Sequence, residues 1–230
     1  MSNVGKTPQR HLQLLIFLLL IFIASPIILP YYYGPIILNI IAAAVLLSAT
    51  YAVSRRRSFL IFALSVSIVS IVLTFWLAAA PSFWLVIVAH STLVVLITFF
   101  AVAILSYVLG SGKVTSDKIY GAVCAYLLFG YAWMFAYSVI EQLQPGSFIS
   151  SSSPTPTDLV GRVMQLRYFS FVTLATVGYG DIVPRSPSAR TLALLEAILG
   201  QFYLVALIGR LVGLHIVHEA NDKNGSHSAK

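Results

Sequence analysis

The chain has 230 residues, of which 59% are hydrophobic and only 9% are charged. An ordinary soluble domain carries roughly 25% charged residues, so this composition indicates an integral membrane protein. The net charge of +7 does not point to nucleic acid, because the basic residues are dispersed among loops and the apolar runs leave no soluble domain to bind it. The single cysteine, Cys124, excludes an intrachain disulfide.

Apolar runs of about 20 residues, the length of one bilayer crossing, occur six times. We expect membrane-spanning helices at residues 12–29, 35–53, 59–80, 83–109, 119–141 and 188–214. A signal peptide is the alternative for the first run, with Lys6 and Arg10 as its basic region. Residues 26–30 offer no small-residue cleavage pattern, however, so we interpret this run as a helix.

Residues 162–175, between the fifth and sixth runs, are too few and too polar at their start to cross a bilayer. They fit a re-entrant helix, which is tolerated at membrane depth where protein and water surround it. The preceding segment, 150–158, is a polar linker with two prolines that cannot form a packed core. The sequence therefore predicts an all-α membrane protein with six transmembrane helices and one re-entrant helix.

Loop charges orient these spans, because cytoplasmic loops carry an excess of Lys and Arg. Nine basic residues fall on the side of the two termini: Lys6, Arg10, Arg55, Arg56, Arg57, Lys113, Lys118, Lys223 and Lys230. Only four fall on the opposite side: Arg162, Arg167, Arg185 and Arg190. We therefore expect both termini in the cytoplasm.

The loop between the re-entrant helix and the last span reads Thr176-Val177-Gly178-Tyr179-Gly180-Asp181. A T-V-G-Y-G loop is typical of a potassium selectivity filter, in which backbone carbonyls replace the hydration shell of the ion. The two glycines can take backbone angles barred to other residues, which turns successive carbonyls toward one axis. A strand running into a glycine turn of a soluble protein is the alternative, which the membrane-protein composition disfavours.

We expect K⁺ to be coordinated by Thr176, Val177, Gly178 and Tyr179, with Gly180 completing the filter. Four copies of Asp181 would form a ring that concentrates cations at the mouth, or each Asp181 would fix the filter from behind by a hydrogen bond. One chain holds one filter loop, a quarter of a four-fold pore. The sequence therefore predicts a homotetramer with the pore on its axis and, beyond permeant K⁺, no cofactor.

With these motifs in place, the region from Ile119 to His218 resembles the pore domain of tetrameric potassium channels. It is most similar to small bacterial ion-channel proteins, at residues 120–124 and 194–201. The resemblance implies a gating hinge at Gly200 and a place in the bacterial inner membrane. It divides the chain into a four-helix domain (1–110), a cytoplasmic linker (111–118), the pore domain (119–218) and a short cytoplasmic tail (219–230).

The fourth span departs from the voltage-gated members of that family, which carry an arginine at every third position. Residues 83–109 contain none. Steep voltage dependence needs several charges moving across the membrane, each worth about 2.3 kcal/mol per 100 mV. We therefore expect a channel that is not steeply voltage-gated.

The last span carries the remaining candidate residues. One helical face presents Gln201, Leu204, Val205 and Ile208, which we expect to line a water-filled cavity. Glu196, the only acid well inside a span, either stabilises the helices by hydrogen bonds or senses protons. His215 and His218, near the end of the helix, either interact with the helix dipole or sense internal pH.

These features together predict a potassium-selective channel that conducts passively, and no nucleophile with a base, metal quartet or cofactor loop points to an enzyme. The alternative is a non-conducting membrane sensor or accessory subunit that keeps the channel fold and uses its first four spans to bind a lipid or partner. Membrane lipids and an unidentified regulatory ligand or subunit are the other expected partners.

Overall fold

The computed structural model describes residues 10–53, 57–110, 115–151, 156 and 158–227, and among these the side chains of 57–59, 208 and 211–227 are not described. The described residues form seven helices and two short strands. They are α1 (Arg10–Ile28), α2 (Gly34–Val53), α3 (Arg57–Ala79), α4 (Phe83–Leu109), α5 (Ser116–Leu143), β1 (Phe148–Ser150), α6 (Leu159–Leu174), β2 (Ile182–Pro184) and α7 (Pro187–His227).

Six of the helices are long and apolar enough to cross a membrane: α1, α2, α3, α4, α5 and the first part of α7. This confirms the predicted six spans, with α4 at the predicted bounds. Helices α5 and α6 each begin three residues earlier than predicted because polar side chains cap them. The Thr115 side chain accepts from the Lys118 amide at the start of α5, and the Asp158 side chain accepts from the Gly161 amide at the start of α6.

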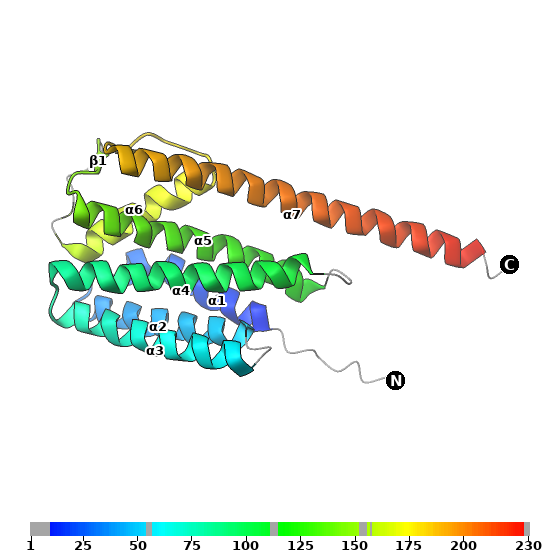
Figure 1. Ribbon diagram of the computed structural model, residues 1–230, viewed down its shortest axis with the longest axis horizontal. Helices are drawn as coiled ribbons and strands as arrows, with labels where there is room; N and C mark the ends of the chain where they lie inside the picture. Colours follow the sequence, from blue (N-terminus) through cyan, green and yellow to red (C-terminus); the bar gives the residue numbers. More distant parts are fainter. Residues whose placement is uncertain (1–9, 54–56, 111–114, 152–155, 157, 228–230) are drawn as a thin grey trace.

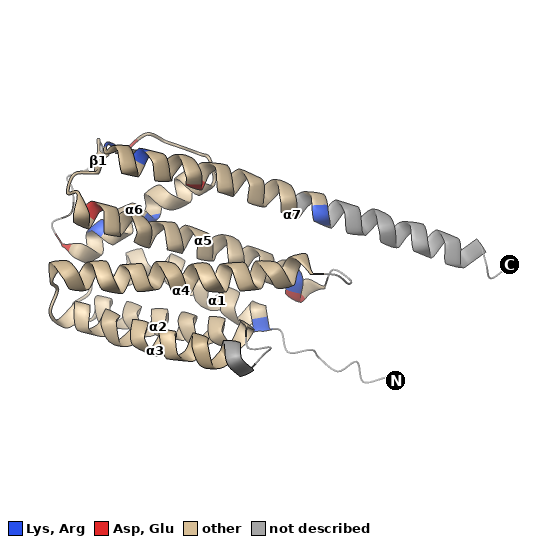
Figure 2. Cartoon of the chain, in the orientation of Figure 1, with Lys and Arg blue, Asp and Glu red and all other residues tan. Residues whose placement is uncertain are grey.

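Helices α1–α4 form a bundle, and α4 packs along α5 at the border with the other helices (Figure 1). The short helix α6 lies between α5 and α7, as expected for a re-entrant helix. One apolar core takes buried residues from all seven helices and both strands, with Leu14, Phe100 and Leu128 almost fully buried. The charged positions lie mainly toward the two ends of the described helices, which leaves a largely uncharged middle (Figure 2).

Helix α7 continues to His227, well past the predicted end of the last span at 214. No proline follows Pro187, and charged residues alone do not end a helix. The helix therefore runs through the border expected between the pore domain, 119–218, and the tail, 219–230.

Two strands that the sequence did not predict tie the segment before α6 to the segment after it. Strands β1 and β2 pair antiparallel, with Phe148 opposite Pro184 and Ser150 opposite Ile182. Three residues are too few to show a strand's alternating pattern, which explains why this ladder was missed. It places the loop of residues 176–181 between two fixed points, the end of α6 and β2.

Candidate functional site

The loop after α6 has an alternating backbone. Thr176, Gly178 and Gly180 have φ values of 57°, 57° and 77°, whereas Val177 and Tyr179 between them do not have positive φ. Such alternation gathers successive amides on one side of the chain and leaves the carbonyls on the other. Thr176 is the only non-glycine residue with positive φ in the described part of the chain. A β-branched residue rarely adopts this conformation, so the surrounding structure must hold it there.

The end of α6 holds the start of this loop through backbone hydrogen bonds. The Thr176 amide donates to the Thr173 carbonyl at 2.9 Å, and the Val177 amide donates to the Val172 carbonyl at 2.9 Å. The Gly178 amide also points to the Val172 carbonyl, at 3.4 Å. Three consecutive amides are thus turned back toward α6, which leaves the carbonyls of the loop free for an ion.

The far end of the loop is fixed by the strand ladder and by Asp181. The Ser151 amide donates to the Asp181 carbonyl at 2.9 Å, and the Ile182 amide donates to Asp181 Oδ1 at 3.1 Å. A hydrogen bond with Asp181 also raises the pKa of the Tyr168 hydroxyl. These are the contacts expected if Asp181 fixes the loop by hydrogen bonds. A ring of four Asp181 side chains that concentrates cations stays a prediction.

Tyr168 and Phe169, two aromatic residues of α6, pack against different parts of the protein. The ring of Tyr168 stacks on the ring of Tyr179 in the loop, with centroids 6.5 Å apart and planes 7° from parallel. Phe169 instead is buried against Tyr137 and Phe148, at 5.2 and 5.1 Å. Tyr168 therefore supports the loop directly, while Phe169 secures α6 to α5.

Glu196 is fully buried and joins three helices. The Tyr137 hydroxyl on α5 donates to Glu196 Oε2 at 2.5 Å, and the Ser170 hydroxyl on α6 lies 2.5 Å from Glu196 Oε1. The Ser170 hydroxyl also lies 2.9 Å from the Gly130 carbonyl. This is the geometry of the stabilising role considered for Glu196, with Ser170 as its partner on α6. No spacing in the sequence identifies Tyr137 as the second partner.

Helix α7 passes very close to the end of α6 at Gly200. A Cβ at Gly200 would lie 2.2 Å from the Leu174 carbonyl oxygen, so only glycine fits there. One residue further, Gln201 Nε2 donates to Thr176 Oγ1 at 3.4 Å. Gln201 thus stands at the inner end of the loop, and the hinge role of Gly200 stays a prediction.

The other predicted residues of α7 lie further toward its C-terminal end than Gln201. Leu204 and Val205 are 42% and 67% exposed in the single chain, as a cavity-lining face requires. The side chains of Ile208, His215 and His218 lie outside the described residues. Their predicted roles in cavity lining and pH sensing therefore stay predictions.

A second polar cluster gathers at the opposite end of the bundle. Gly110 is the C-cap of α4. Its carbonyl accepts a hydrogen bond from Lys118 Nζ at 2.9 Å and another from the Arg210 guanidinium. Nearby, His11 on α1 pairs with Asp117 on α5 at 2.8 Å. The cluster joins α1, α4, α5 and α7 at the end away from the loop of residues 176–181.

Comparison with known proteins places this loop inside an ion-channel segment. Residues 148–214, from β1 into α7, match the family described as "Ion channel". The expected resemblance to ion-channel proteins is thereby confirmed for this segment.

The curated relatives that match are potassium channels by name. The chain is 39% identical over 77 residues to the inward rectifier potassium channel Kirbac3.1 of Paramagnetospirillum magnetotacticum, which is 34% of this chain and 21% of the relative. It is 37% identical over 68 residues to two pore potassium channel c of Oryza sativa subsp. japonica, 30% of this chain and 14% of the relative. It is 31% identical over 97 residues to a voltage-gated potassium channel of Aeropyrum pernix, 42% of this chain and 28% of the relative.

The chain thus spans between 14% and 28% of the length of these relatives. No solved structure matches the chain.

Proposed function

We propose that this protein is a potassium-selective channel that conducts passively through a homotetrameric pore. The observation that carries the proposal is the alternating backbone at Thr176, Gly178 and Gly180, with its amides turned toward α6. Four such loops around an axis would present rings of carbonyl oxygens, which can replace the water around a dehydrated K⁺ ion.

The electrostatic field of helix α6 also supports K⁺ binding at this loop. Its C-terminal end reaches the loop at Leu174, and its last turn has no basic residue. The C-terminal end of a helix carries about half a negative charge, which favours a cation in front of it. Four such ends would stabilise K⁺ at the inner mouth of the filter, beside Gln201.

Exposed groups in the single chain support assembly into a tetramer. Val177 and Tyr179 in the loop are 52% and 70% exposed, and Phe202 on α7 is 69% exposed. A lone chain would leave its filter carbonyls without a pore to line, because one loop supplies only a quarter of the ring. We also propose that both termini lie in the cytoplasm, because basic residues are in excess on their side. The proposed location in a bacterial inner membrane rests on the resemblance to small bacterial ion-channel proteins.

A flux assay tests the proposal. Protein reconstituted in liposomes should pass K⁺ and Rb⁺ but little Na⁺, and Gly178→Ala should abolish this flux or its selectivity, because φ is 57° there. Gly146→Ala is a matched control, since Gly146 also has positive φ, 81°, and neither glycine has an atom within 4 Å of an added Cβ. We expect Gly146→Ala to keep selective flux, and equal Na⁺ and K⁺ flux through the native protein would contradict the proposal.

A further inference from the structure

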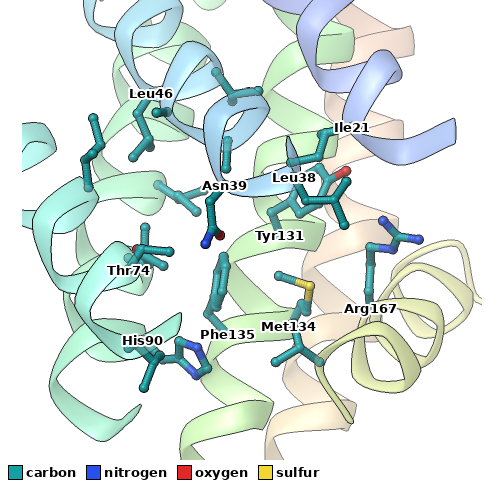
Figure 3. Close-up of a pocket in the computed structure, with 18 of the residues that line it drawn as sticks. Ile21, Leu38, Asn39, Leu46, Thr74, His90, Tyr131, Met134, Phe135 and Arg167 are labelled. Atoms are coloured by element: carbon teal, nitrogen blue, oxygen red, sulfur yellow. The ribbon is translucent and has the colours of Figure 1, made fainter. Parts of the chain in front are cut away.

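A cavity of about 390 Å³ lies between the first four helices and helices α5 and α6 (Figure 3). Ligand sites of small molecules typically measure roughly 300–1,000 Å³, so the space suits a single ligand of modest size. Its lining is mostly apolar, and it is separate from the loop of residues 176–181. The polar side chains that line it are those of Asn39, Thr74, His90, Tyr131 and Arg167.

Polarity in this cavity changes with depth. Asn39, Thr74 and His90 lie five to seven residues from the helix ends nearest the filter, or about 7–11 Å along the helix axes. Leu46 and Phe100 lie about 18–26 Å from the same ends. The cavity therefore has a polar part near the filter end and an apolar part toward the middle of the bundle.

Asn39 and Arg167 both line the cavity, and Figure 3 shows them on different sides of it. Figure 3 shows the Asn39 side chain pointing into the middle of the cavity, and among the described residues it makes no hydrogen bond. The guanidinium of Arg167 contacts the Ser25 hydroxyl, lies 5.3 Å from the centre of the Phe22 ring and also interacts with the Tyr131 hydroxyl. None of these partners is a carboxylate, and no described carboxylate forms an ion pair with Arg167.

The His90 side chain already has a hydrogen-bond partner within the protein, so it is less available to a ligand than Asn39. Its Nδ1 lies 2.9 Å from the Ser138 hydroxyl, and its ring lies 5.1 Å from the ring of Phe135. Among the described residues, Arg167 is therefore the charged side chain of the cavity that has no carboxylate partner. A partly buried cation without an anion is costly in an apolar environment, which an anionic ligand would relieve.

The exposed lining residues mark where a ligand enters. Of all the lining side chains only Phe75, Ala78 and Pro81 are exposed, and they lie together at the C-terminal end of α3. Exposed Trp76 and Trp84 flank this opening. Tryptophan gathers at membrane interfaces, so the opening lies where lipid head groups and chains meet.

We propose that this cavity binds an amphiphile with one alkyl chain inserted and an anionic head, a carboxylate or phosphate, paired with Arg167. The chain fills the apolar part beside Leu46, Phe100 and Leu128. The ligand thereby bridges α2, α4, α5 and α6.

Binding to the full-length protein in detergent tests this proposal. Tritiated palmitate is bound and then displaced by unlabelled palmitate, hexadecanol or phosphatidylglycerol, where hexadecanol has the same chain without the charge. We expect hexadecanol to compete about tenfold less well than palmitate, the size of a charged hydrogen bond. Displacement by phosphatidylglycerol would identify a membrane lipid as a source of the head group, and displacement by palmitate alone would identify a free fatty acid.

Variants of the cavity distinguish the contribution of the ligand's anionic head to binding from that of its alkyl chain. Arg167→Gln should weaken palmitate binding about tenfold and leave hexadecanol binding unchanged, while Arg167→Lys keeps most of the affinity. Leu46→Phe should weaken both ligands by filling the apolar part, whereas Leu47→Phe is the matched control because Leu47 is 48% exposed. Equal binding of palmitate and hexadecanol to the native protein would overturn the proposal, even if Arg167→Gln did not fold. Equal effects of Leu46→Phe and Leu47→Phe would also overturn it.

Discussion

At the scale of single residues, Glu196 is bound by donors from two other helices. The Tyr137 and Ser170 hydroxyls both reach its carboxylate in a fully buried site. A buried polar group is tolerated when its hydrogen bonds are made and is expensive when one is lost. The contacts of Glu196 are therefore best explained by stabilisation of the pore helices.

Removing one of these contacts tests that explanation. Tyr137→Phe should lower the free energy of unfolding by about 1–3 kcal/mol, because it leaves a buried carboxylate oxygen without its donor. Tyr120→Phe, on the same helix, is the control, since the Tyr120 hydroxyl makes no hydrogen bond among the described residues. The measurement is unfolding by sodium dodecyl sulfate titration. Equal unfolding curves for the two variants would contradict a stabilising role.

Between elements, the close crossing of α6 and α7 positions the start of the loop of residues 176–181. Gly200 lets α7 approach the Leu174 carbonyl, and Gln201 then reaches Thr176. Family resemblance implies that Gly200 is a hinge, whereas the structure shows a close approach of two helices there. These two roles predict different effects of Gly200→Ala. A hinge alone would be stiffened by alanine, whereas a tight crossing would be forced apart.

Alanine substitutions at two glycines of α7 separate these roles. Gly200→Ala should destabilise the protein by about 1–3 kcal/mol, since the added Cβ meets backbone at 2.2 Å. Gly209→Ala should be neutral or stabilising by up to about 1 kcal/mol, because nothing lies within 4 Å and alanine favours helix. Both are measured by the same detergent titration. Unchanged stability with altered opening in Gly200→Ala would instead favour a hinge without close packing.

At the scale of the whole molecule, long-range contacts mark the limit of what the sequence could predict. The candidate filter loop could be recognised because its signature is six consecutive residues, and the spans could be predicted because hydrophobic length is a local property. Tyr137 and Glu196 lie 59 positions apart, and Ser170 and Glu196 lie 26 apart, so no spacing rule connects them. The close crossing at Gly200 and the cavity beside Arg167 likewise exist only once separate helices are packed.

The four-helix domain also bears on gating. Helix α4 has no Lys or Arg and buries apolar side chains such as Leu96 and Phe100 against its neighbours. We therefore expect the conductance of the reconstituted channel to change only weakly with voltage, with an apparent gating charge of about one elementary charge or less. Bilayer recording in symmetric K⁺ measures it. A gating charge of several units would show that another charged segment moves across the membrane.

The proposed potassium selectivity is tested most directly by the reversal potential of a single channel in a bilayer with K⁺ on one side and Na⁺ on the other. Four carbonyl loops built from residues 176–180 should favour K⁺, which shifts the reversal potential strongly toward the K⁺ equilibrium potential. Gly146→Ala should keep this shift, and Gly178→Ala should lose either the shift or the current, since only Gly178 lies in the filter. A reversal potential near zero in the native protein would contradict the account.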